Sequence, residues 1–314
     1  MIESLQQSPR QRLAVALATY NGGKWLSEQL ESLALQTEVA TIIVGDDGSQ
    51  DDTWTILQRW CNAMPGGMCL LPAAQRHGVV QNFSRILSAS DAEWTACCDQ
   101  DDYWDPEHLA QLLEAGHELA EHTGRDVPIL VVADLRLVDA NRQLLRQSLW
   151  RSMHFEPQRG SDVKTLVVMN MFAGCAMLMN RPLLRAALPI PEQAVMHDWW
   201  LALTAAILGD IAIVKGTVGD YRQHDSNVVG APDLLKRLRR TLGLRSSRRK
   251  GVAAQCEALL ARHSTQMTAE KRTVLEAAVR LQDANHCQRI GILLRHGITK
   301  RPWWRQLNFL LGGG

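Results

Sequence analysis

Short apolar runs alternate with helix-like segments through the first half of the chain, and this alternation most limits the folds open to it. Residues 13–19 and 41–45 are apolar or β-branched runs, each followed by a turn and by apolar residues at helical spacing. Further strands are predicted near 69–71, at 94–98 and at 128–133. Strands that alternate with helices favour a mostly parallel sheet with helices on both faces. We therefore predict an α/β fold.

Polar residues follow three of these predicted strands. Tyr20 comes after the first strand, Asp47 after the second, and an acidic loop at 99–102 after the strand at 94–98. In open parallel sheets, ligands bind beyond the carboxyl ends of the strands. We therefore expect the three sites to meet at one edge of the sheet. Farther along, the pattern predicts strands near 134–139, 174–180 and 211–214 and a helix over 198–208.

The acidic loop carries Asp99, Asp101 and Asp102 directly after an apolar strand. Carboxylate oxygens grouped on a short loop are suitable ligands for a divalent cation such as Mg²⁺, which can hold the phosphates of a substrate. The alternative is a solvated acidic turn. Asp105 is predicted to cap the next helix, with Pro106 at the first helical position.

Other candidate residues are weaker when each is taken alone. Asp47 could accept a hydrogen bond from the imide N–H of a pyrimidine, and Tyr20 could stack on a base, although a plain turn explains both. Asp198 precedes two tryptophans and could act as a base held over a sugar face, whereas tryptophan pairs are more often core residues. His224 could complete a metal site begun by Asp101, or be a structural histidine.

Charge is unevenly distributed along the chain. The net charge is +1, but residues 234–314 hold 17 Lys and Arg against 4 Asp and Glu. The composition changes near Pro232, which predicts one domain over 1–232 and a helical, basic C-terminal region over 233–314, with one or two amphipathic helices within 252–286. This region suits contact with an anionic membrane, an acceptor or another subunit, or it is a solvated helical appendage. Nucleic acid fits less well, because aromatic residues are not interleaved with the arginines.

The cysteines and the N-terminus bear on the compartment. Seven cysteines, an odd number, form no C-x-x-C pair, which favours reduced and mostly structural thiols. The N-terminus has no basic region followed by an apolar one, and no apolar run reaches the length of a membrane span. We therefore expect a cytoplasmic protein, neither secreted nor transmembrane, that lies peripherally on the inner membrane if its basic region binds lipid.

Eight motifs occur in this order: ATYNGG, VGDDGSQDDT, HGVVQNFSRIL, CDQDDYWDPEHL, DLRLVD, GCAMLMNR, HDWWLAL and YRQHDSN. Together they resemble the inverting, nucleotide-sugar-dependent glycosyltransferases of family 2, and most of all the rhamnosyltransferase-like branch that builds bacterial surface polysaccharides. The resemblance covers roughly residues 10–230. It implies a single GT-A domain, in which two abutting Rossmann-like halves share a continuous central sheet.

The resemblance implies roles for individual residues in binding the donor. The base-binding carboxylate of the family falls on Asp47, and Tyr20 and the backbone near Ala18 would line the nucleoside pocket. The acidic metal motif begins at Asp99, and Asp101 is the expected ligand of Mg²⁺ or Mn²⁺ on the donor diphosphate.

The resemblance also implies roles in catalysis. The general base of the family falls on Asp198, with His197 in place of the usual acidic first member of its motif. The late histidine that the family offers to metal or diphosphate falls on His224, and Arg222 lies close enough to join it. The role of Asp102 stays open.

The implied reaction transfers a sugar, rhamnose as the best guess, from a dTDP- or UDP-sugar to a hydroxyl group of a glycan or lipid-linked acceptor. Asp198 would take the acceptor proton, and the configuration at the anomeric carbon would invert. Two alternatives stay open. A nucleotidyltransferase also uses an α/β sheet and metal-held phosphates, although its Gly-rich loop followed by Lys or Arg is missing here. The residue at His197 raises the possibility of a sugar-nucleotide binding protein that has lost catalysis.

Overall fold

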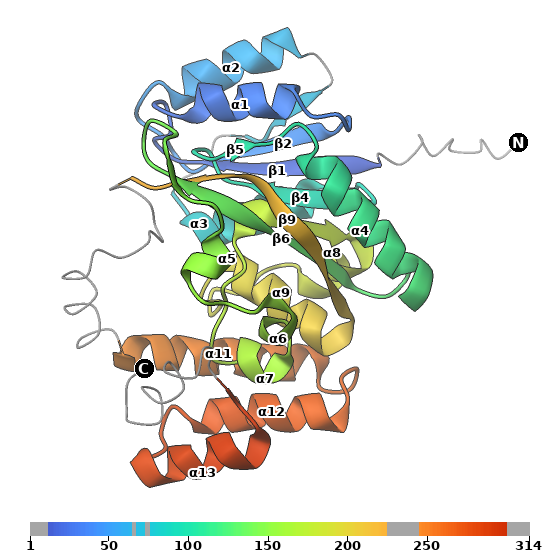
Figure 1. The fold of residues 1–314 in the computed structure, drawn as a ribbon, viewed down its shortest axis with the longest axis vertical. Coiled ribbons are helices and arrows are strands. Elements are labelled where there is room, and N and C mark those ends of the chain that lie inside the picture. Colours follow the sequence, from blue (N-terminus) through green and yellow to red (C-terminus); the bar gives the residue numbers. More distant parts are fainter. Residues whose placement is uncertain (1–11, 65–66, 73–75, 225–244, 300–314) are drawn as a thin grey trace, which may run out of the picture.

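A continuous sheet lies at the centre of the molecule (Figure 1). The computed structural model describes residues 12–64, 67–72, 76–224 and 245–299. In chain order, the strands of the sheet are β1 (Leu13–Thr19), β2 (Thr41–Asp46), β3 (Met68–Leu70), β4 (Trp94–Cys98), β5 (Tyr103–Trp104), β6 (Ile129–Val138), β7 (Leu144–Arg146), β8 (Met177–Asn180) and β9 (Asp210–Arg222). Their spatial order is β3-β2-β1-β4-β8-β6-β9-β5, and β7 pairs with β6.

The sheet is mixed and mostly parallel, which confirms the predicted α/β class. β1 pairs in parallel with β2 and β4, β2 with β3, and β6 with β9. β8 runs antiparallel between β4 and β6, so that it joins the two halves of the sheet. The strand predicted at 174–180 is shorter than expected, because Gly174–Ala176 form a 3₁₀ helix (η1) ahead of β8.

Alternate residues of β1 face two different cores. Leu13, Val15 and Leu17 belong to one buried cluster, and Ala14 and Ala16 belong to the other. Successive side chains of a strand point to opposite faces, so a continuous apolar run buries both faces of a sheet. This is why the apolar runs in the sequence predicted a sheet covered on both sides.

Helices cover both faces of the sheet. The helices of the first face are α1 (Leu26–Ala34), α2 (Thr53–Ala63) and α4 (His108–Thr123). Those of the second face are α3 (Val79–Ala89), α8 (Arg181–Ala187) and α9 (His197–Leu208). The short helices α5 (Leu149–Ser152), α6 (Pro157–Gly160) and α7 (Val163–Leu166) lie between β7 and η1 in the chain.

The described C-terminal helices belong to the same buried core as α9, and the last of them packs against the one before it, away from α9 (Figure 1). They are α11 (Arg245–His263), α12 (Ala269–Arg280) and α13 (His286–His296). Cys256 and Leu259 of α11 and Val274 of α12 belong to the same buried cluster as Trp200 of α9. Two helices therefore occupy most of the range 252–286, as predicted, and the division after residue 232 stays a prediction. Two stretches lie outside the described residues: 225–244, which includes the start of the basic region, and 300–314, which includes its two tryptophans.

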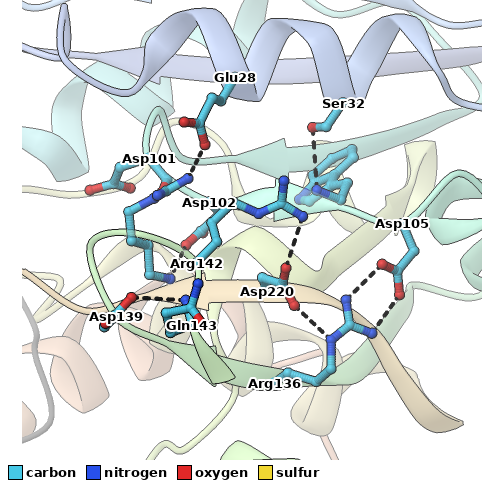
Figure 2. Close-up of polar contacts among 12 residues, drawn as sticks. Glu28, Ser32, Asp101, Asp102, Asp105, Arg136, Asp139, Arg142, Gln143 and Asp220 are labelled. Carbon is cyan, nitrogen blue, oxygen red and sulfur yellow. Dashed lines mark hydrogen bonds and ion pairs between the residues drawn. The ribbon is translucent and has the colours of Figure 1, made fainter. Parts of the chain in front are cut away.

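Asp105 does not cap the helix that follows it. α4 begins at His108, two residues after Pro106, and the residue at its N-cap is Glu107. The carboxylate of Asp105 instead accepts two hydrogen bonds from the guanidinium group of Arg136 in β6, at 2.7 and 2.8 Å (Figure 2). A bidentate pair of opposite charges is stronger than a bond to a neutral backbone amide. The predicted cap is therefore wrong, because Arg136 of β6 engages both oxygens of the carboxylate, a long-range contact that no local pattern indicates.

Two expectations from composition can be compared with the structure. All seven cysteines are free in the structure. Among the described helices, none combines the length and the apolar character that crossing a bilayer requires.

Candidate active site

Three segments bring polar side chains together at one edge of the sheet. The acidic loop follows β4, His224 lies two residues beyond β9, and Asp198 lies in the first turn of α9. Asp99, on the acidic loop, is close enough to Asp101 and Asp198 for their negative charges to raise its pKa. The structure therefore gathers these four residues, which come from distant parts of the sequence, in one region.

Asp101 and His224 form a direct pair. Nε2 of His224 lies 2.8 Å from Oδ2 of Asp101. Both side chains keep some access to solvent, with exposed fractions of 18% for Asp101 and 10% for His224. The indole ring of Trp25, at the start of α1, stacks on the imidazole ring with centroids 5.5 Å apart. An imidazole nitrogen and a carboxylate oxygen are thus held side by side at the surface of the site.

Two carboxylic acids at the site hold their protons unusually strongly. Burial raises the pKa of Asp198 to about 7, and hydrogen bonds from the backbone amide of Trp199 and the side chain of Asn170 oppose this rise. Burial, followed by the charges of Asp101 and Asp198, raises the pKa of Asp99 to about 7. A carboxylate whose pKa is near neutrality can accept a proton during a reaction and release it afterwards. Asp198 thus has the acidity that a general base requires.

Asp102 is the buried last residue of the acidic loop. Its side chain is almost fully buried, and Oδ1 accepts a hydrogen bond from the backbone amide of Arg222 at 3.2 Å. Burial, followed by the charges of Asp101 and Asp99, raises the pKa of Asp102 well above its usual value. Ligand atoms of Asp99, Asp102 and Cys175 lie within 4.8 Å of one another. Asp102 therefore connects the loop to the end of β9, which is a role that the sequence left open.

Gln100 ties the acidic loop to the end of β1. Its Oε1 accepts a hydrogen bond from the backbone amide of Tyr20 at 2.8 Å, and its Nε2 donates to the carbonyl of Tyr20 at 3.0 Å. A Cβ atom placed on Gly22 would lie 2.1 Å from Oε1 of Gln100. Glycine at position 22 thus makes room for the contact. This role of Gln100 was not predicted from the sequence, although the residue lies inside the acidic motif.

The residues predicted to bind a nucleoside follow β1 and β2. Oδ1 and Oδ2 of Asp47 accept hydrogen bonds from the backbone amides of His77 and Gly78, at 2.7 and 2.9 Å. The guanidinium carbon of Arg76 lies 4.3 Å from the ring centroid of Tyr20. Ala18 is buried next to them, near the end of β1. The segment 76–78 therefore meets both Tyr20 and Asp47, and the nucleoside-binding roles of these residues stay predictions.

His197, next to the candidate base, is an apolar packing partner in this structure. Its ring stacks on Phe83 with centroids 3.8 Å apart, and among the described residues neither ring nitrogen has a hydrogen-bond partner. Burial lowers the pKa of His197 to about 3, so the ring is neutral. Gly174 packs against it, because a Cβ atom there would lie 2.5 Å from Nε2. Trp199 and Trp200 are both buried, which agrees with the core alternative for this pair.

Arg222 lies at the end of β9 and is almost fully buried, with 1% of its residue surface exposed. Each of the three guanidinium nitrogens donates to a protein oxygen: Nε to the carbonyl of Asp101, Nη1 to the carbonyl of Ala140, and Nη2 to the carboxylate of Glu28. The resemblance implies that this arginine meets a diphosphate. In this structure it is surrounded by protein groups, and Glu28 is a further partner that sequence reasoning missed.

The residues at the edge fit a divalent cation. Asp101 and His224 offer a carboxylate oxygen and an imidazole nitrogen within 2.8 Å of each other, and Mn²⁺ and related ions accept both kinds of ligand. Burial raises the pKa of Asp99, and repulsion from the charges of Asp101 and Asp198 raises it further. A bound cation would relieve this repulsion, because it stabilises the charged form of a nearby carboxylate.

Sequence comparison identifies similar proteins. The sequence model of the family described as glycosyl transferase family 2 matches residues 14–186. A dTDP-rhamnosyl transferase of Shigella flexneri, RfbG, is 28% identical over 240 residues, which cover 73% of this chain and 78% of that protein. An uncharacterized protein of Mycobacterium tuberculosis is 27% identical over 215 residues, or 68% of this chain. The match spans 59% of the length of this mycobacterial relative.

Structure comparison confirms the predicted GT-A fold. A fragment of TarS from S. aureus superimposes with a TM-score of 0.54 at 18% identity, and the match covers 92% of this chain and 93% of that one. A mannosyltransferase from Pyrobaculum calidifontis, solved with GDP-Man and Mn²⁺, gives a TM-score of 0.58 at 18% identity, with 92% of this chain and 74% of that one covered. At this level of identity the likeness concerns the fold.

Proposed function

The chain belongs to glycosyl transferase family 2, and from this premise we propose that it is an inverting, metal-dependent glycosyltransferase. It transfers a sugar from a nucleoside diphosphate to a hydroxyl group of a glycan or lipid-linked acceptor. One observation carries the proposal: Asp198, whose pKa is raised to about 7, lies within electrostatic reach of Asp99 on the acidic loop. A candidate base and a candidate diphosphate site are thus neighbours.

Asp198 acts as the general base in this proposal. Its carboxylate takes the proton of the acceptor hydroxyl, and the acceptor oxygen forms a bond to the anomeric carbon. The bond from that carbon to the diphosphate oxygen breaks on the opposite face, and its electron pair leaves with the nucleotide. The configuration at the anomeric carbon inverts in this single displacement. The side chain of Asn170, which hydrogen-bonds the carboxylate, orients it toward the acceptor.

The acidic loop and the end of β9 hold the donor diphosphate. Asp101 and His224 are the proposed ligands of Mg²⁺ or Mn²⁺, and Asp99 supports them. When bound, the cation supplies positive charge that offsets the charge developing on the leaving diphosphate. Gln100 keeps this loop attached to β1 through both polar groups of the Tyr20 backbone.

The ends of β1 and β2 form the proposed nucleoside pocket. Tyr20 offers a ring face to a base, Asp47 offers a carboxylate to an imide N–H, and the backbone near Ala18 forms the floor. In this structure, Arg76 lies over the Tyr20 ring, and the amides of His77 and Gly78 donate hydrogen bonds to Asp47. Binding of a base at these residues would therefore require the segment 76–78 to rearrange.

The donor is proposed to be dTDP-rhamnose. The similarity to RfbG, a dTDP-rhamnosyl transferase, over 73% of this chain supports this choice. A thermal-shift screen of dTDP-, UDP- and GDP-sugars with and without Mn²⁺ tests it, because a ligand that binds only the folded state raises the unfolding temperature. The expected result is the largest shift with dTDP-rhamnose and Mn²⁺. A larger shift with another nucleotide-sugar would indicate that this other compound is the donor.

Product analysis tests the reaction itself. We expect Mn²⁺-dependent release of the nucleoside diphosphate, and a product whose anomeric configuration, read by NMR, is opposite to that of the donor. Retained configuration would exclude the mechanism. Donor binding without transfer or hydrolysis would instead support a sugar-nucleotide binding protein.

The basic C-terminal region, 234–314, is proposed to bring the enzyme to an anionic membrane on which lipid-linked acceptors are carried. Its 17 Lys and Arg against 4 Asp and Glu support this proposal. Flotation of the protein with anionic vesicles at low salt tests it. We expect co-flotation that is lost in high salt, since salt screens such attraction. If the protein does not float with the vesicles at low salt, the proposal that this region binds a membrane is wrong.

A further inference from the structure

Arg222, at the end of β9, forms an ion pair with Glu28 of α1. Nη2 of Arg222 contacts Oε2 of Glu28 in the first turn of α1. The two side chains differ in environment, since 1% of the Arg222 side chain and 45% of the Glu28 side chain are exposed. A buried guanidinium group that loses its carboxylate partner is strongly destabilised. Glu28 thus supplies a negative charge that offsets the burial of this cation.

Arg222 also binds the acidic loop in two ways. Its Nε donates to the backbone carbonyl of Asp101 at 2.9 Å, and its own backbone amide donates to Oδ1 of Asp102 at 3.2 Å. Two residues farther along the chain, His224 pairs with the side chain of Asp101. The end of β9 therefore holds both the backbone and the side chain of Asp101.

The first turn of α1 supports the same strand end through Trp25. The guanidinium carbon of Arg222 lies 4.5 Å from the centroid of the Trp25 ring, and the imidazole ring of His224 stacks on that indole. A cation over an aromatic face is attracted by the ring quadrupole. Trp25 thus contacts both residues that flank Gln223, and Glu28 contacts one of them, Arg222.

We propose that Arg222 and Glu28 are positioning residues that fix Asp101 relative to His224, and that Arg222 acts without contact with the donor diphosphate. The three guanidinium nitrogens of Arg222 already donate to protein oxygens, and 1% of the side chain is exposed. This inference rests on the proposed function in one respect, because it takes Asp101 and His224 as the ligands of the metal ion.

Hydrogen–deuterium exchange of the metal-free protein tests the positioning role directly. Glu28→Ala removes the carboxylate, and Glu31→Ala is the matched control, because it removes the same charge from an exposed residue of the same helix. We expect faster exchange in peptides covering 99–104 and 220–224 for Glu28→Ala and unchanged exchange for Glu31→Ala. Equal exchange in the two variants would overturn the inference.

Mn²⁺ binding without nucleotide, followed by calorimetry, provides a second measurement. Groups that orient metal ligands typically contribute about 10–100-fold in affinity. We expect a loss in this range for Glu28→Ala, a smaller loss for Glu28→Gln, which keeps an oxygen acceptor, and no change for Glu31→Ala. If Arg222→Lys instead left Mn²⁺ affinity unchanged and weakened only the binding of nucleoside diphosphate, Arg222 would contact the diphosphate and the inference would be wrong.

The two measurements separate this inference from the proposed function. Asp101→Asn serves as the reference for the metal site itself. If Asp101→Asn leaves Mn²⁺ affinity unchanged, the proposed ligand pair is wrong, and the exchange experiment still decides whether Glu28 and Arg222 order the loop. If Asp101→Asn abolishes Mn²⁺ binding and Glu28→Ala has no effect on binding or exchange, the positioning role alone is rejected.

Discussion

Nε2 of His224 lies 2.8 Å from Oδ2 of Asp101, although 123 residues separate the two in the chain. The contact exists because β9 reaches the same edge of the sheet as the loop after β4, with β8 and β6 between these strands. A long-range pair of this kind provides mixed oxygen and nitrogen ligands that no local motif contains.

Replacing Asp198 by asparagine should abolish most transfer and leave donor binding nearly intact. The variant keeps the size of the side chain and loses its capacity to accept a proton. General-base catalysis typically contributes about 10²–10⁴-fold, so we expect a fall in kcat of this order. Turnover assays and a donor-binding measurement on the same preparation check it. Wild-type turnover in Asp198→Asn would exclude this residue as the base.

The activity should rise with pH and level off near neutrality. Burial raises the pKa of Asp198 to about 7, so below pH 7 the carboxyl group is protonated and unable to act as a base. We expect kcat/KM to fall about tenfold per pH unit on the acidic side. Asn170→Ala removes a hydrogen bond to the charged form and should move the midpoint upward. A downward shift, or a profile that is flat from pH 5 to 8, would contradict this assignment.

Replacing either proposed metal ligand should weaken the binding of Mn²⁺ to the enzyme. For Asp101→Asn or His224→Ala, we expect the Mn²⁺ concentration at half-maximal activity to rise by at least about tenfold, since even groups that only support metal ligands contribute this much. Asp91→Asn is a suitable control, because it removes one charge from an exposed residue ahead of β4. Equal Mn²⁺ dependence in all three variants and the wild type would place the cation elsewhere.

Alanine at position 22 should destabilise the protein through its contact with Gln100. The new Cβ atom would lie 2.1 Å from Oε1 of Gln100, and forcing an extra carbon into a packed site typically costs about 1–3 kcal/mol. Urea unfolding of Gly22→Ala measures the free energy of unfolding. Gly291→Ala in α13 is the control, because nothing lies within 4 Å of its added Cβ atom.

A double-variant cycle assigns the cause of this effect. If the clash with Gln100 is responsible, Gly22→Ala should cost less in a Gln100→Ala background, since residues in contact do not behave additively. Equal costs in both backgrounds would show that another contact is strained.

Predictions from the sequence were correct where a local pattern of residues is enough to indicate burial or position in the fold. The apolar run at 13–19 became β1, buried on both faces, and the acidic residues after β4 lie at the predicted edge of the sheet. Prediction failed for Asp105, whose partner Arg136 is 31 residues away in β6. The role of Glu28 was also missed. A glutamate at a polar position of a helix gives no local indication that its partner is a buried arginine.

The sequence by itself determined the class of fold, the family and the order of the polar sites, because apolar periodicity and short motifs depend on neighbouring residues alone. The tertiary structure decided which side chains meet. Only the packed sheet pairs Asp101 with His224, gives Asp198 its raised pKa and buries His197 against Phe83. Burial and charge–charge contacts depend on distances through space, and these distances are set when the strands assemble.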